Sequence, residues 1–156
     1  MANNIRIICV GKLKAEHWRG AQDHYLKRLK PYAEIELTQL KDGPGALPPE
    51  ERTRVEGEAI LAALRPQDHA LCLDRRGKAQ DSPGLADKLR LLLEDANRRP
   101  CFVVGGAYDI WRPVRDQAQG LISLGPMTLP HELARVVLLE QLYRAMTILR
   151  GLPYHH

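Results

Sequence analysis

Short apolar runs alternate with longer stretches in which apolar residues recur at helical spacing. Runs of four to six residues that are mostly apolar or β-branched predict strands, and the helical stretches are bounded by prolines or N-capping residues. The strands are expected at residues 5–10, 35–40, 70–73, 101–104 and 121–124. The helices are expected at residues 17–29, from Pro48–Pro49 to Arg65–Pro66, from Ser82 as N-cap to Ala96, and at 113–118 and 132–150.

Regular alternation of strands and helices predicts an α/β fold with a mostly parallel, Rossmann-like sheet that is flanked by helices. The runs at 101–104 and 121–124 are almost wholly apolar, as expected of strands covered on both faces. The run at 35–40 alternates with Glu36 and Thr38 and predicts an edge strand. A length of 156 residues without repeat or linker predicts one domain over residues 1–156.

Composition says little about the function of the protein. A formal net charge of +4 favours a polyanionic partner without requiring one. The apolar run at residues 5–10 is too short for a signal-peptide core, so we expect a cytoplasmic protein. The cysteines Cys9, Cys72 and Cys101 are far apart and lie in apolar runs, which predicts buried thiols rather than a disulfide framework or a zinc site.

Basic residues follow three of the predicted strands. Ligands of parallel α/β sheets bind beyond the carboxyl ends of the strands, so these charges are expected to converge on one rim and to bind phosphates. The alternative is that they are simply solvated. The residues are Lys12 and Lys14, then Arg75, Arg76 and Lys78, then Arg112 and Arg115.

Two turns contain glycine or proline residues that shape the main chain. Gly105–Gly106 directly follows a buried strand, where glycine permits a sharp turn or the close approach of a ligand. The segment from Gly125 to Pro130 contains one glycine and two prolines, and its main-chain groups need partners outside the sheet. A bound adenosine or methionine group fits both turns, and so does a purely structural role. Neither a G-x-G-x-x-G nor a Walker loop is present, which removes the usual support for hydride transfer or nucleotide hydrolysis.

The last helix and the tail suggest further partners. The helix is apolar over most of its circumference, which predicts a second buried face and, most simply, a homodimer. Glu140 and Arg144 are spaced for an ion pair on its polar stripe. The tail holds Tyr154, His155 and His156, which are suited to base stacking or proton transfer. A metal site is the alternative for the histidine pair, but no third ligand accompanies it.

Several segments together resemble the ribosomal RNA large-subunit methyltransferase H family of α/β-knot (SPOUT) methyltransferases. The resemblance runs from residue 7 to the C-terminus. It implies a C-terminal trefoil knot and a homodimer that uses S-adenosylmethionine to methylate N3 of a pseudouridine in 23S ribosomal RNA on assembled ribosomes. The segments that carry it are Gly105–Gly106, Leu124 to His131, Leu142-Tyr143-Arg144-Ala145 and Pro153-Tyr154-His155.

The resemblance also implies roles for individual residues. Positions that match the cofactor-contacting ones of the family are Leu73, Gly105, Gly125, Pro126, Met127, Thr128, Leu129 and Pro130. Positions at the substrate side are His131, Arg144, Tyr154 and His155. One departure is Asp109, which stands where the family usually has a further glycine and puts the shape of that loop in question.

Methylation of an imide nitrogen requires removal of its proton and in-line positioning of the methyl group. We expect His131 or His155 to handle the proton and Arg144 or His155 to stabilise the anion. Two other functions remain open at this stage. One is a non-catalytic ribosome-binding or assembly factor, which only Asp109 suggests. The other is a methyltransferase of the same fold that acts on transfer RNA or on free ribosomal RNA.

Overall fold

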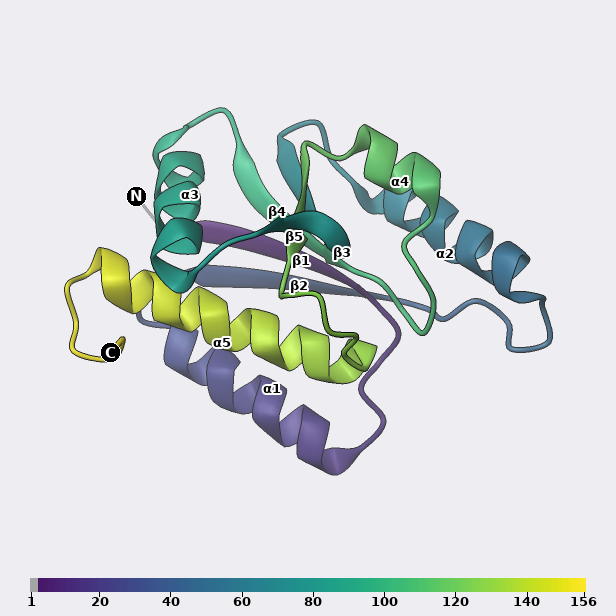
Figure 1. Cartoon of the computed structure of the whole chain (residues 1–156), viewed down its shortest axis with the longest axis horizontal. Helices are drawn as coiled ribbons and strands as arrows, with labels where there is room; N and C mark the ends of the chain where they lie inside the picture. Colours follow the sequence, from purple (N-terminus) through teal and green to yellow (C-terminus); the bar gives the residue numbers. More distant parts are fainter. Residues whose placement is uncertain (1–2) are drawn as a thin grey trace.

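Five parallel strands form one sheet in a computed structural model that describes residues 3–156 (Figure 1). The strand order is β2-β1-β4-β3-β5, and every neighbouring pair is parallel. The strands are β1 (Asn4–Val10), β2 (Glu34–Leu40), β3 (Asp68–Ala79), β4 (Arg99–Val104) and β5 (Gly120–Ser123). The helices are α1 (Glu16–Leu29), α2 (Pro49–Ala63), α3 (Ser82–Glu94), α4 (Arg112–Gln117) and α5 (His131–Leu149).

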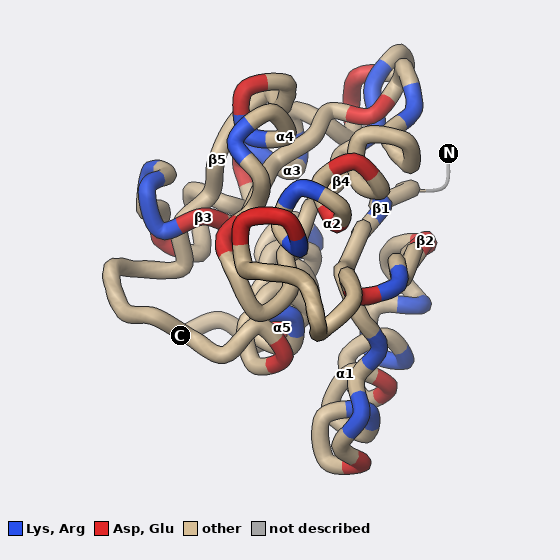
Figure 2. Tube along the Cα trace, turned by 90° about the vertical axis from the view of Figure 1, so that its right-hand side faces the viewer, with Lys and Arg blue, Asp and Glu red and all other residues tan. Residues whose placement is uncertain are grey.

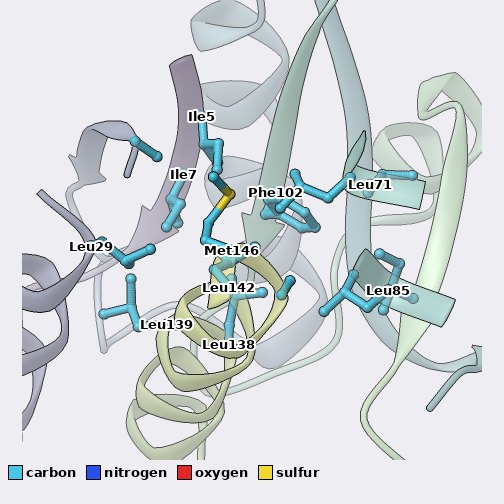
Figure 3. Packing of buried hydrophobic residues seen from close by; sticks show 14 of the residues in the cluster. Ile5, Ile7, Leu29, Leu71, Leu85, Phe102, Leu138, Leu139, Leu142 and Met146 are labelled. Atoms are coloured by element: carbon cyan, nitrogen blue, oxygen red, sulfur yellow. The ribbon is translucent and has the colours of Figure 1, made fainter. Parts of the chain in front are cut away.

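The strands bury alternate side chains on opposite faces of the sheet, because successive residues of a strand point in opposite directions. One face packs against α1, α3 and α5, and Phe102 and Leu71 lie at the centre of that core (Figure 3). The other face packs against α2 and α4, with Ile60 and Val114 covering Ile8. The predicted helical layers on both faces are therefore confirmed.

Helix α5 lies between α1 and α3 on one face of the sheet (Figure 1). Its buried residues include Leu138, Leu139 and Leu142, which pack on the sheet and on these two helices (Figure 3). Much of the apolar circumference that predicted a dimer is thus used within one chain. The apolar residues of α5 that remain only half-buried are Leu133, Ala134, Val137, Tyr143, Ile148 and Leu149. The homodimer therefore stays a prediction, supported by a smaller apolar surface than the sequence suggested.

The boundaries differ from the prediction in two instructive places. Strand β3 extends to Ala79, with a register shift against β5 between Leu73 and Lys78, so the basic residues expected in a loop there belong to a bulged strand. The N-cap of α3 is Asp81, whose carboxylate accepts from the amide of Gly84 at 2.8 Å. The expected N-cap, Ser82, instead donates to Gln141 on α5 at 2.6 Å. The prediction of β2 as an edge strand is confirmed.

All three cysteines are buried in strands, as expected. Burial raises the pKa of Cys9 to about 11 and the pKa of Cys72 and Cys101 to about 12, so the thiols stay protonated at neutral pH. Within residues 3–156, no helix is long and apolar enough to cross a bilayer.

Candidate cofactor cleft and substrate-side residues

Two adjoining cavities lie at the carboxyl ends of β3, β4 and β5. The larger has a volume of about 290 Å³ and the smaller about 130 Å³. Leu73 and Leu129 line both of them. Gly125, Met127 and Thr128 line the larger, whereas Gly105 and His131 line the smaller. The two turns singled out in the sequence therefore meet at one cleft, which we call the carboxyl-edge cleft.

The glycines of the two turns act in different ways. Gly125 has a φ of +122°, a conformation that L side chains rarely adopt. Gly105 and Gly106 do not have positive φ, but a Cβ on Gly105 would lie 3.0 Å from Ile110. A Cβ on Gly106 would lie 3.1 Å from both Glu56 and Val10. Close packing thus explains the paired glycines, and backbone conformation explains Gly125.

The turn from Gly125 to Pro130 offers hydrogen-bond donors to a ligand. Within the described chain, the main-chain N–H groups of Met127, Thr128 and Leu129 donate to no protein acceptor. Pro126 and Pro130 flank this triplet. Proline lacks an N–H and fixes φ, so these two residues disfavour helical hydrogen bonding in the turn. Free main-chain donors beside an apolar cavity fit a ligand that combines a heteroaromatic ring with polar groups.

Asp74 supplies a carboxylate to the cleft that sequence reasoning missed. Its side chain is only 4% exposed and lines both cavities. Burial raises the pKa of Asp74, but hydrogen bonds from Arg76 at 2.8 and 2.9 Å and the nearby Arg115 outweigh that effect and lower it overall. A charged carboxylate, bound by Arg76 through both of its oxygens, therefore lies in the wall of the cleft. Its position directly after Leu73 was the only signal in the sequence.

Asp109 fits the loop in which it replaces a glycine. No residue other than glycine has positive φ among residues 3–156, so Asp109 carries no backbone strain of that kind. Its carboxylate pairs with Arg76 at 3.3 Å, and the residue lines both cavities. Asp109 therefore does not support the alternative of a non-catalytic ribosome-binding or assembly factor.

The predicted basic rim is less uniform than expected. Figure 2 looks onto the carboxyl ends of the strands and shows basic segments interspersed with acidic ones. Arg75 lines the larger cavity, but Arg76 is paired with Asp74 and Arg112 with Asp116 at 3.6 Å. Among the predicted rim residues, the exposed side chains without an acidic partner in the described structure are those of Lys12, Lys14, Arg75 and Lys78.

The remaining substrate-side residues gather at the other end of α5. Arg144 binds the carboxylate of Glu140 at 2.8 Å, lies 4.7 Å from the ring centroid of Tyr154, and approaches Nδ1 of His155 at 3.3 Å. A rise of 1.5 Å per residue places Arg144 about 20 Å along the helix from His131. One chain thus brings Arg144, Tyr154 and His155 together but leaves His131 apart, beside the cleft. No group of three metal-ligating side chains forms around the terminal histidines or elsewhere in the described part.

A family model described as "Predicted SPOUT methyltransferase" matches residues 3–155 of the chain. The chain belongs to the SPOUT methyltransferases. Its parallel sheet with helices on both faces agrees with the α/β-knot fold expected of that family. The cleft described above therefore lies in a protein whose family transfers methyl groups.

Relatives named ribosomal RNA large subunit methyltransferase H align over nearly the whole SPOUT chain. The protein of Desulfovibrio desulfuricans is 54% identical over 152 residues, 97% of each chain. The protein of Lawsonia intracellularis is 46% identical over 155 residues, 99% of each chain. A solved structure, a probable methylase family protein from Haemophilus influenzae Rd KW20, covers 99% of this chain and 71% of its own at 12% identity. Its TM-score of 0.54 supports the fold alone.

Proposed function

We propose that the protein methylates N3 of a pseudouridine in 23S ribosomal RNA, on assembled ribosomes in the cytoplasm, with S-adenosylmethionine as methyl donor. One observation carries the proposal. Two turns far apart in the sequence meet at a single cleft, and the main-chain donors of one turn have no protein acceptor. The near full-length similarity to enzymes named for ribosomal RNA methylation supports the choice of substrate.

S-adenosylmethionine, when bound in the cleft, supplies an electrophilic methyl group. The amides of Met127, Thr128 and Leu129 are positioned to donate to its polar edges, and Leu73 and Leu129 to cover its apolar surface. The close packing at Gly105 keeps that wall of the cleft free of a side chain. The charged carboxylate of Asp74 favours a ligand that carries positive charge.

A second copy of the chain completes the site in this proposal. Arg144 lies about 20 Å along α5 from His131, which lines the cleft of the same chain, too far to act on an acceptor held there. His155 lines a further cavity of about 540 Å³ together with Leu124 and Gly125. Two apolar side chains beside the cleft, Leu124 and Met127, are 37% and 83% exposed. An antiparallel pairing of α5 helices about a twofold axis would cover them and bring the tail of one chain to the cleft of the other.

The proton of the acceptor nitrogen then has two candidate receivers. His131 lines the smaller cavity of its own chain, and His155 would come from the partner. The guanidinium of Arg144, held by Glu140, would stabilise the developing anion. Positioning and electrostatics suffice for this reaction, so no protein nucleophile is needed.

Nucleoside mass spectrometry provides the test. Ribosomes from a strain that lacks the gene are incubated with the protein and isotopically labelled S-adenosylmethionine, and the nucleosides of 23S ribosomal RNA are then compared with those of transfer RNA. The proposal predicts one labelled N3-methylpseudouridine in 23S ribosomal RNA from ribosomes. Label in transfer RNA alone, or in no RNA, would contradict it.

A further inference from the structure

A row of tyrosine and arginine side chains lies where α1 and α5 end. The ring centroids of Tyr143 and Tyr154 are 4.8 Å apart, and those of Tyr143 and Tyr32 are 6.3 Å apart. The guanidinium carbon of Arg28 lies 5.3 Å from the Tyr143 ring and 5.9 Å from the Tyr154 ring. That of Arg150 lies 5.6 Å from the Tyr32 ring. The row begins at the substrate-side residue Tyr154 and leads away from it.

The row ends at a groove with a volume of about 670 Å³, more than twice the volume of the larger cavity of the cleft. The groove lies between the end of α1, the start of β2 and the end of α5. Its walls carry two cations, Lys30 and Arg150, one carboxylate, Glu34, and the phenol ring of Tyr32. An aromatic residue and cationic residues therefore line the same groove.

The cations of this surface form no ion pair within the described structure. Arg28, Lys30 and Arg150 are exposed, and none has an acidic partner within 4.0 Å among residues 3–156. Arg144, by contrast, is paired with Glu140. Exposed cations without an acidic partner are left free to meet phosphates. Half-buried tyrosine rings and the guanidinium groups that lie over them are groups on which bases stack.

We propose that this surface, formed by Arg28, Lys30, Tyr32 and Arg150, binds the RNA strand that flanks the target nucleotide. The inference rests on the proposed function, since it takes ribosomal RNA as the substrate. Unpaired cations interleaved with aromatic rings match single-stranded or looped RNA. Its phosphates bind the cations, and its unstacked bases stack on aromatic rings or guanidinium groups. The excess of exposed positive charge on this surface favours a polyanionic partner over a protein one. Continuity with Tyr154 sets the direction in which the strand leaves the site.

The test uses the full-length protein and ribosomes that lack the modification. The triple variant R28A/K30A/R150A is compared with wild type and with K41A/R54A/R90A, which removes three exposed cations elsewhere. We expect KM for ribosomes to rise about tenfold or more in the first variant only, with kcat retained. The plot of log(kcat/KM) against log salt should become shallower by about 2, since each lost phosphate contact of a single strand contributes about 0.7.

A second variant separates stacking from charge. Tyr32→Leu removes the ring but no charge, so KM should rise several-fold with an unchanged salt slope. Melting temperature and affinity for S-adenosylmethionine establish that each variant is folded, and the single variants R28A and R150A replace the triple one if it is not. Unchanged KM and salt slope in the first variant, or equal losses in the two triple variants, would overturn the proposal. The proposed function fails separately, if wild type itself does not label ribosomes.

Discussion

The guanidinium of Arg135 on α5 donates a 2.8 Å hydrogen bond to the main-chain carbonyl of Gly11, directly after β1. It also reaches the carbonyl of Val10 at 3.3 Å and the side chain of Gln39 on β2 at 3.2 Å. Arg135 is 1% exposed, and its Nε has no partner within residues 3–156. The first turn of α5, which carries His131, is thereby fixed to the carboxyl edge of the sheet.

Replacement of Arg135 by methionine should lower the free energy of unfolding by about 2–4 kcal/mol, because two buried carbonyl groups lose their donor. Urea unfolding measures the change. Arg135→Lys serves as control, since it keeps a cation near the same carbonyls and should lose less. A methionine variant as stable as wild type would show that the buried guanidinium contributes nothing to the attachment of α5.

A buried ion cluster at the amino end of the sheet predicts acid sensitivity. The side chain of Asp68 is 1% exposed, binds Arg6 at 2.6 Å and Arg99 at 2.9 Å, and accepts from the amide of Arg65 at 2.9 Å. Burial raises the pKa of Asp68, but these contacts outweigh burial and hold it below the ordinary value of 3.8. The stabilisation is therefore complete above that value, and it is lost as pH falls through the lower pKa of the folded state.

Asp68→Asn should cost about 3–5 kcal/mol at neutral pH, because Arg6 stays buried and keeps only the more distant, partly exposed carboxylate of Glu36 at 3.6 Å. The variant should also lose stability less steeply than wild type as the solution is acidified. Unfolding free energies measured by urea from neutral pH to below the ordinary pKa of aspartate give both quantities. Parallel curves for the two proteins would mean that Asp68 is not a source of the acid sensitivity.

The charge of Asp74 should matter for the cofactor. Asp74→Asn keeps the size of the side chain but leaves Arg76 and Arg115 beside the cleft with less negative charge around them. We expect the Kd for S-adenosylmethionine, which carries positive charge, to rise about tenfold by calorimetry. Asp116→Asn removes a carboxylate that is outside the cleft and should leave the Kd unchanged. Equal affinities for all three proteins would exclude an electrostatic role for Asp74.

Gly125 tests the conformation of the second turn. An alanine there has open space but must adopt a φ near +122°, which costs about 1–3 kcal/mol or forces the turn to rearrange. The melting temperature should fall, and the affinity for S-adenosylmethionine should fall with it. Gly20→Ala on α1 also meets open space but has helical φ, so it should raise the melting temperature. A Gly125→Ala variant that melts no lower than wild type and binds S-adenosylmethionine as tightly would contradict the role assigned to Gly125.

The sequence predicted most of the fold because its signals were local. Apolar runs marked all five strands, and proline marked the first turn of α2 and of α3. The two turns of the cleft were recognisable from Gly105–Gly106 and from Gly125 to Pro130, since residues that shape backbone directly stand out in a sequence. Parallel pairing then placed both turns at the same edge.

The rest depended on contacts between distant residues. The apolar circumference of α5 suggested a second chain, but the packing of α1 and α3 on its sides covers much of it. The register shift in β3 turned an expected basic loop into a bulged strand. The role of Asp74 and the tyrosine row around Arg28 arise from side chains that no local pattern links.

Subunit mixing tests most directly whether a cofactor cleft completed by a second chain methylates ribosomal RNA. Leu129→Arg places a charge in the cleft, and Arg144→Ala removes the charge at the far end of α5, so each variant alone should be nearly inactive on ribosomes. After exchange of subunits in an equal mixture, half of the dimers are mixed and each holds one intact site, which predicts about a quarter of wild-type methyl transfer. Activity that stays at the level of the separate variants, although mixed dimers have formed, would contradict the shared site.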